Sequence, residues 1–158
     1  MSGFALVKRV LGVDHGQARI GLAISDELGM LAHPLETVPA KPIDAAAKRI
    51  AQLAREKDVQ AVVIGLPRHM SGESGTAAAE VNAFAGKLRP LLPCAVVMWD
   101  ERLTTTAAHR ALRDAGKKTR ATRGVVDQVA AQMILQGYLD SRQTAPSPAE
   151  PSGDWSQD

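Results

Sequence analysis

The sequence predicts a mixed α/β fold, in which antiparallel strands come first and parallel strands with helical crossovers follow. Two apolar segments at 5–14 and 18–26, separated by a short polar turn, predict a β-hairpin. Short continuous apolar runs at 59–65 and 94–99 alternate with segments of helical spacing, as expected for strands buried on both faces. The length of 158 residues and the 45% hydrophobic content fit one domain with a proper core.

Local signals define the elements in chain order. Pro34 lies within the third apolar strand and predicts an edge position or a bulge there. Pro42 stands at the first turn of the first predicted helix, where a missing N–H costs little. Thr104 and Gly116 are the N-cap and the C-terminal glycine of the third predicted helix. The expected elements are strands at 5–14, 18–26 and 30–38, a helix at 43–54, a strand at 59–65, a helix at 76–88, a strand at 94–99, and helices at 105–116 and 125–139.

The end of the chain differs in composition from the body. Residues 141–158 are rich in Pro, Ser and acids and hold one large apolar residue, Trp155, which predicts a disordered tail. We therefore expect a folded domain over 1–140 and a tail over 141–158. No segment resembles a signal peptide or reaches the roughly 18 apolar residues of a membrane span, so we expect a cytoplasmic protein. Cys94, the only cysteine, lies in an apolar run and is typical of a small core residue.

The charge distribution suits a polyanionic partner such as nucleic acid. The formal net charge is +2, but the tail is acidic, so the body is more basic than the whole chain. Solvated loops and structural ion pairs are the alternatives for the basic residues. Aromatic residues make up only 3%, so recognition through the backbone is expected rather than base stacking. The candidate phosphate contacts are Arg19, Arg68, Arg102, Lys117, Lys118, Arg120 and Arg123.

Acidic residues at strand ends are the candidate catalytic groups, because open α/β sheets bind ligands at the carboxyl ends of their strands. Asp14 ends the first strand, Asp100 and Glu101 end the last, and Asp127 opens the final predicted helix. Strand alternation puts Asp100 and Glu101 on opposite faces, so only one of them can easily point at Asp14. Each acid has a structural alternative: a turn cap for Asp14, an ion pair with Arg102 for Glu101, and a helix-dipole role for Asp127.

Four ordered motifs resemble those of a known family. They are GVDHGQARIGLAISD, VVIGLPRHMSGES, WDERLTT and DQVAAQMILQGYLD, and the resemblance covers residues 10–140. They resemble the YqgF family, whose members are described as Holliday junction resolvases and as pre-16S ribosomal RNA nucleases. The resemblance implies a ribonuclease H-like fold, and it implies that Asp14, Glu101 and Asp127 are the catalytic acids.

Three carboxylates suit metal-dependent hydrolysis of a phosphodiester. Two Mg²⁺ or Mn²⁺ ions about 4 Å apart activate a water and stabilise charge on the leaving oxygen. Carboxylate oxygens, water and substrate phosphate are the ligands that Mg²⁺ prefers. We expect Asp14 to bridge the two metal sites, while Glu101 and Asp127 each complete one of them.

The expected substrate is nucleic acid, with the 5′ end of precursor 16S ribosomal RNA favoured over a branched DNA junction. Junction resolvases carry a second acid one helical turn after the last, where this chain has Ala130. Two other functions stay open. One is a sugar-kinase or actin-like ATPase, which needs a second domain and a second phosphate loop, and the other is a non-catalytic binding module of nucleic acid or the transcription machinery. The sequence favours neither a monomer nor a homodimer.

Overall fold

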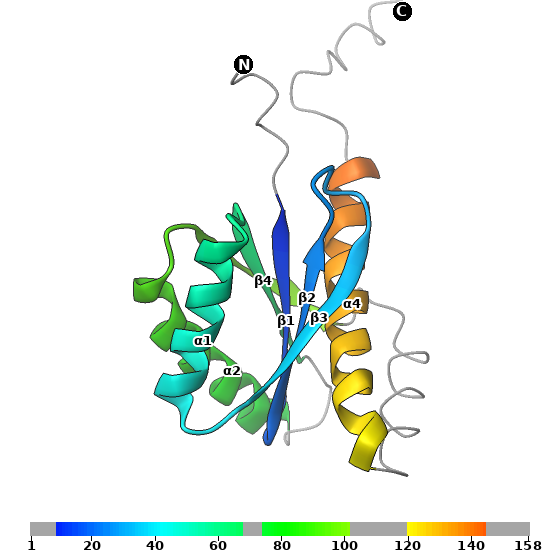
Figure 1. Cartoon of the computed structure of the whole chain (residues 1–158). Coiled ribbons are helices and arrows are strands. Elements are labelled where there is room, and N and C mark those ends of the chain that lie inside the picture. The colour runs from blue at the N-terminus through cyan, green and yellow to red at the C-terminus, as the bar shows by residue number, and fades with distance from the viewer. Residues whose placement is uncertain (1–8, 68–73, 102–119, 145–158) are drawn as a thin grey trace, which may run out of the picture.

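The apolar segments pair into one five-stranded sheet with helices on both faces, as a computed structural model shows (Figure 1). The structure describes residues 9–67, 74–101 and 120–144, without the side chains of 74–76, 120–126 and 143–144. The elements are β1 (Val10–His15), β2 (Arg19–Ser25), β3 (Ala32–Pro39), α1 (Ile43–Glu56), β4 (Ala61–Leu66), α2 (Ser74–Leu88), the short 3₁₀ helix η2 (Arg89–Leu91), β5 (Ala95–Asp100) and α4 (Arg120–Thr144).

The strands lie in the order β3–β2–β1–β4–β5. β1 pairs antiparallel with β2, and β2 with β3, whereas β4 pairs parallel with both β1 and β5. Helices α1 and α2 cover one face of the sheet, and α4 crosses the other (Figure 1). The predicted fold class, with antiparallel strands first and parallel crossovers afterwards, is therefore confirmed.

The first three strands form an antiparallel meander whose turns fit the local sequence. The β1–β2 hairpin is closed by a 2.9 Å hydrogen bond from the Gly16 amide to the Arg19 carbonyl. A Cβ at Gly16 would lie only 2.7 Å from that carbonyl oxygen, so the tight turn needs a glycine. The register between β2 and β3 shifts where Pro34 pairs with Ala23, and β3 is an edge strand. Both structural features that Pro34 predicts, the edge and the bulge, are present.

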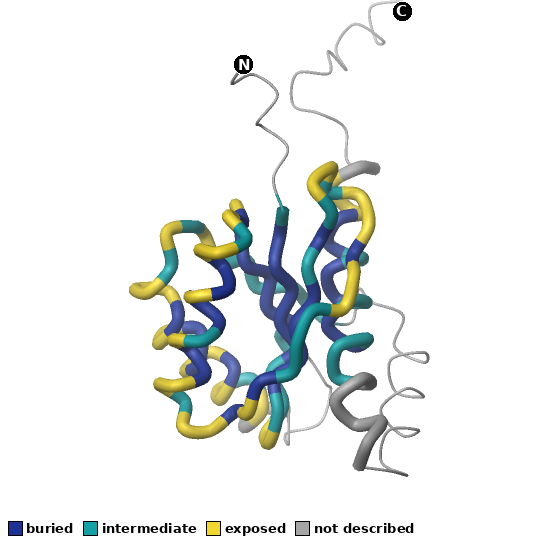
Figure 2. The backbone as a smooth tube through the Cα atoms, viewed as in Figure 1, coloured by how far each residue is buried: buried dark blue, intermediate teal, exposed yellow. Residues whose placement is uncertain are grey.

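Each face of the sheet has its own apolar core. Towards α1 and α2, strand residues such as Leu11 and Ile64 pack with the fully buried Phe84 of α2. Towards α4, Val63 packs with Ile134 and other apolar residues of the helix. Figure 2 shows the buried segments concentrated in the central strands and on the inner sides of the helices. Because β1 and β4 are buried on both faces, β4 is a continuous apolar run and β1 is apolar as far as Val13.

Glycines on the sheet let α4 approach closely. A Cβ at Gly12 of β1 would lie 2.7 Å from the Cβ of Leu135. A Cβ at Gly65 of β4 would lie 2.5 Å from Cδ1 of Ile134. A larger residue at Gly12 would force the helix outward, because it would also meet the backbone oxygen of Ala131 at 3.1 Å. At Gly65 the near atom is the end of the Ile134 side chain, so a larger residue there would displace that side chain.

A row of glutamines joins α4 to the edge strand β3. Gln132 Nε2 donates to the Ala32 carbonyl at 2.8 Å, and Gln128, one turn earlier, donates to a β3 side-chain hydroxyl at 3.0 Å. Gln136 uses both ends of its amide, because it accepts from the Ala32 amide and donates to the Met30 carbonyl, both at 2.9 Å. The spacing of four residues places the three glutamines on one helix face. There they bind backbone and side-chain groups of β3 and the carbonyl of Met30, which precedes the strand.

The last helix is longer than the predicted 125–139. α4 begins at Arg120 and continues through Gly124 as far as Thr144. A single glycine inside a helix costs only about 1 kcal/mol, which the burial of the apolar face of α4 offsets. The predicted boundary at 140 therefore falls within this helix, and the rest of the predicted tail, residues 145–158, lies outside the described residues.

Three further expectations have different outcomes. The helix predicted over 105–116 lies outside the described residues. Cys94 is partly buried against the core beneath α1 and α2, and burial raises the pKa of its thiol, as suits a core residue and not a nucleophile. Within the part of the chain that the structure describes, no helix has both the length and the apolar character needed to cross a membrane.

Candidate active site

Asp14 is a carboxylate buried at the end of a buried strand. It is 2% exposed and pairs in register with Gly21 of β2, so it belongs to the strand ladder and not to the turn that follows. Gly12, two residues earlier, faces α4, and alternation along β1 therefore points the Asp14 side chain to the same face. Burial of a charged carboxylate is costly unless cations or hydrogen-bond donors compensate it. A cation bound at this face would compensate the charge, so Asp14 is a candidate metal ligand.

Glu101 reaches the same face of the sheet directly after β5. Val97 and Trp99 pack on the core beneath α4, whereas Met98 packs on the opposite core, so the predicted alternation is confirmed. The Oε2 atom of Glu101 lies 2.9 Å from the position that a Cβ on Gly65 would take. The glycine of β4 therefore makes room for this carboxylate on the side of the sheet that α4 covers.

Asp127 comes to this face from α4. It is the eighth residue of the helix, two turns inside, whereas helix-dipole effects fade within the first turn, so the helix-dipole alternative does not fit. Ala131 and Ile134, one and two turns further on, are fully buried against the sheet. A Cβ at Gly21 of β2 would collide with the backbone carbonyl of Asp127 and lie 3.0 Å from its Cβ. The sequence analysis missed this contact, although a glycine inside a strand is a known signal of close backbone approach.

The order of the strands sets the three carboxylates in a row. Asp14 stands on β1, while Asp127 lies over β2 through its contact with Gly21. Glu101 lies on the other side of Asp14, against Gly65 of β4. Asp14 is therefore flanked by an acid on each side. Among the described residues, no group of three or more His, Cys, Asp or Glu side chains is placed so that it could hold a metal ion.

The carboxylate of Asp127 is held by Arg19. The Nε of Arg19 donates to Oδ2 of Asp127 at 2.7 Å. The arginine side chain is 38% exposed and the aspartate side chain 16%, so the ion pair is partly shielded from water. The sequence left two interpretations of Arg19, a phosphate contact and a structural ion pair. The contact with Asp127 is the structural ion pair. An ionised carboxylate has about four lone-pair positions, so Asp127 keeps further capacity to bind a cation.

The remaining candidate phosphate contacts are not described by the structure. Four of them fall outside the described residues, namely Arg68, Arg102, Lys117 and Lys118. Two stand in the first turn of α4, namely Arg120 and Arg123, and their side chains are also outside the description. Their backbone positions precede Asp127 by about two turns and one turn of helix. Their contact with nucleic acid stays a prediction.

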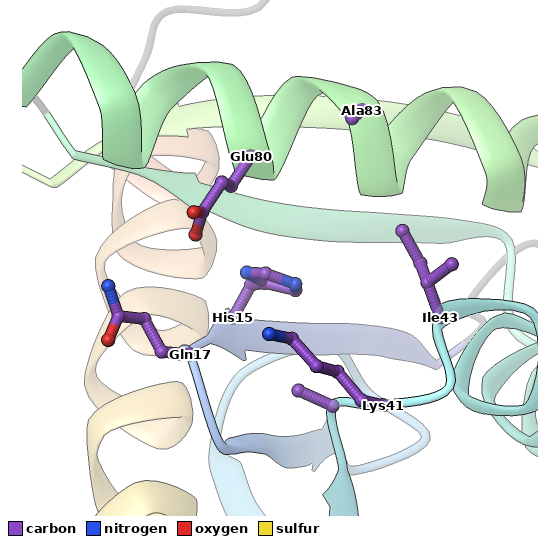
Figure 3. Close-up of a pocket in the computed structure, with 7 residues that line it drawn as sticks. His15, Gln17, Lys41, Ile43, Glu80 and Ala83 are labelled. Carbon is purple, nitrogen blue, oxygen red and sulfur yellow. The ribbon is translucent and has the colours of Figure 1, made fainter.

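His15 lies on the opposite face of the sheet from its neighbour Asp14. Its ring packs against Phe84 of α2, with the two ring centroids 4.9 Å apart. Figure 3 shows His15 in a cavity of about 390 Å³, whose lining also includes Lys41 and Glu80. Burial lowers the pKa of His15, although the charges of Glu80 and Asp14 oppose this shift. Since the sheet separates the imidazole from the carboxylate row, we assign His15 no part in the candidate active site.

The sheet and its covering helices put the chain in the class of α/β proteins with a ribonuclease H-like fold. The structure of Thermus thermophilus RuvC in complex with a Holliday junction substrate matches with a TM-score of 0.55 at 17% identity, covering 87% of this chain and 96% of that one. A second Thermus thermophilus RuvC structure also gives 0.55, at 15% identity, covering 85% and 96%. At such identities the likeness establishes the fold alone.

The chain belongs to the RuvX family, whose model, described as Holliday junction resolvase, matches residues 8–141. Relatives carrying the name "Putative pre-16S rRNA nuclease" include one from Chloroflexus aggregans, 48% identical over 133 residues, which cover 84% of this chain and 94% of the relative. Another, from Halalkalibacterium halodurans, is 47% identical over 137 residues, or 85% and 98%. The relative from Nocardia farcinica is 50% identical over 141 residues, or 85% and 78%. The resemblance to the YqgF family, which the four motifs carry, is confirmed.

Proposed function

We propose that the protein is a metal-dependent endonuclease that hydrolyses phosphodiester bonds and processes the 5′ end of precursor 16S ribosomal RNA in the cytoplasm. The observation that carries this proposal is the carboxylate row, in which buried Asp14 has Glu101 on one side and Asp127 on the other. The name shared by relatives at 47–50% identity supports RNA as the substrate. The family description supports a nuclease as the general class.

The carboxylate row fits divalent metal ions. Its ligands are hard carboxylate oxygens, which Mg²⁺ and Mn²⁺ prefer to nitrogen or sulfur. Asp14 stands between the other two acids, so it would be shared by two ions, with Glu101 completing one site and Asp127 the other. When bound, such ions supply an activated water and stabilise charge on the leaving oxygen.

The protein's own part is to hold the acids in place and to limit their contact with water. Asp14 is fixed by the β1–β2 ladder and is almost fully buried. Glu101 is seated against Gly65, and Asp127 is held by Arg19. Electrostatic interactions are stronger where water is excluded, and groups that are already oriented need no rearrangement during the reaction.

Precursor RNA is favoured over a DNA junction as substrate. Junction resolvases are expected to carry a second acid one turn after Asp127, but this chain has Ala130 there. The alanine is fully buried. The family description nevertheless makes a four-way junction the second substrate to test. The basic residues proposed to bind the phosphate backbone would serve either substrate, because phosphate contacts carry no sequence information.

The test is cleavage of end-labelled precursor 16S ribosomal RNA and of a four-way DNA junction, each with Mg²⁺ or Mn²⁺. We expect the wild type to cut the RNA only with metal, and Asp14→Asn to lose at least about 100-fold in rate, since it removes the shared ligand. Asp44→Asn is the matched control, because Asp44 is an exposed acid on α1, and it should cut like the wild type. Preference for the junction would identify a resolvase. Failure of the folded wild type to cut either substrate would contradict the proposal and favour a binding module.

A further inference from the structure

Arg19 and Asp127 are 108 positions apart in the chain and meet at the carboxylate row through a 2.7 Å hydrogen bond. We propose that Arg19 is a positioning residue, which fixes the Asp127 carboxylate beside Asp14 so that its other oxygen is available to a divalent metal ion. The proposal rests on the proposed function, because it concerns one of the two metal sites. On this proposal the principal partner of Arg19 is Asp127 and not a phosphate of the substrate.

Two residues of β2 contact Asp127. Arg19 and Gly21 are two residues apart on one strand, so both face α4. Gly21 admits the backbone of Asp127, and Arg19 binds its side chain through Nε and Oδ2. The backbone and the carboxylate of Asp127 are therefore both located relative to β2, and β2 is in register with Asp14 on β1.

Arg19 supplies Asp127 with a lateral partner. Asp14 lies within a strand ladder and is almost fully buried, so packing limits its rotamers. Asp127 projects from a helix, where its side chain has several rotamers to choose from. A hydrogen bond to one carboxylate oxygen selects one orientation and leaves lone pairs for a metal ion, as outer partners of metal ligands commonly do.

The direct test measures how many Mn²⁺ ions the protein binds and how tightly, from the loss of the free Mn²⁺ EPR signal. We expect Arg19→Gln to weaken one of the two ions by about 10-fold or more and to leave the other unchanged. Arg19→Lys should recover part of the affinity, because an ammonium group also donates to a carboxylate. Arg49→Gln is a matched control, since Arg49 is also 38% exposed and pairs with Glu36 away from the carboxylate row. This control should bind Mn²⁺ like the wild type.

A double mutant separates positioning from a general effect of charge. In the Asp127→Asn background, Arg19→Gln should cause no further loss of Mn²⁺ affinity, because its action passes through Asp127. Unchanged or tighter Mn²⁺ binding by Arg19→Gln alone would overturn the proposal. A rise in KM for RNA with unchanged Mn²⁺ affinity would also overturn it and restore the phosphate contact. If the wild type bound no Mn²⁺, the proposed function would fail too, whereas a loss in Asp127→Asn without one in Arg19→Gln would remove only this inference.

Discussion

At Gly21 the backbones of β2 and α4 touch, because a strand residue without a side chain lies beneath Asp127. Gly21→Ala would place a Cβ against the Asp127 carbonyl, so the helix has to move or the strand has to bend. We expect this substitution to destabilise the fold by about 1–3 kcal/mol, the usual cost of overpacking, and to slow cleavage by displacing Asp127. Urea denaturation measures the first effect and RNA cleavage the second.

Gly86 provides the matched control for this substitution. It lies within α2, and a Cβ there would meet nothing within 4 Å. Gly86→Ala should therefore stabilise the protein by about 0.5–1 kcal/mol, because alanine is the better helix former. A Gly21→Ala variant as stable and as active as Gly86→Ala would contradict the proposed contact.

We expect the protein to lose stability in mild acid, because the pKa of His15 is lowered. Its pKa in the folded protein is lowered from the ordinary value of 6.5, mainly by burial, so the unfolded chain takes up a proton first as the pH falls. Its contribution is present above pH 6.5 and is lost as the pH falls towards the folded pKa. Thermal melts from pH 8 to pH 5 should show this loss in the wild type but not in His15→Gln.

The carboxylate of Glu36 tests whether the assignment to His15 is specific. The hydrogen bond from Arg49 lowers the pKa of Glu36 below its ordinary value of 4.5, so its stabilisation is lost only at lower pH. His15→Gln should therefore keep the loss below about pH 4.5, which other carboxylates share. Parallel curves for the wild type and His15→Gln between pH 8 and pH 5 would contradict the role given to His15.

Among the elements, the α4 glutamines make a specific prediction about the edge strand. Gln136→Ala removes two hydrogen bonds to backbone groups and should destabilise the protein by about 1–2 kcal/mol. It should also speed hydrogen exchange of the Ala32 amide, because this N–H donates to the Gln136 side chain. In Gln52→Ala, the control, the two lost bonds join exposed side chains within α1, one donated to Glu56 and one accepted from Arg49, so the cost should stay within about 0.5 kcal/mol. Equal costs for the two variants would contradict the role of the glutamines.

Local patterns predicted those features that one segment determines alone. Alternation in 94–99 put Asp100 and Glu101 on opposite faces, and the family resemblance selected Glu101. Pro34 predicted an edge position or a bulge, and β3 has both. Features that depend on two distant segments were not predictable in this way. In the sequence, the glutamines of α4 resemble an ordinary solvated helix face, and only the packing of β3 against them shows their partners. The contact of Gly21 with Asp127 likewise depends on how α4 packs on the sheet. The same holds for Arg19, whose partner is 108 residues away.

For the whole molecule, the order of the sheet explains how three acids from different parts of the chain meet. The antiparallel meander and the parallel crossovers share β1, so β2 and β4 lie on either side of it. Helix α4 then closes over this face, where glycines on β1, β2 and β4 admit it. Asp14 is the central member of the row because β1 lies between the two strands against which the other acids lie.

The central claim is that Asp14 is shared by two metal ions, and a count of bound Mn²⁺ by EPR tests it most directly. We predict two ions for the wild type, one for Glu101→Gln, one for Asp127→Asn, and none for Asp14→Asn at the same concentration. Circular dichroism confirms that each variant is folded. Two ions bound to folded Asp14→Asn with wild-type affinity would contradict the account.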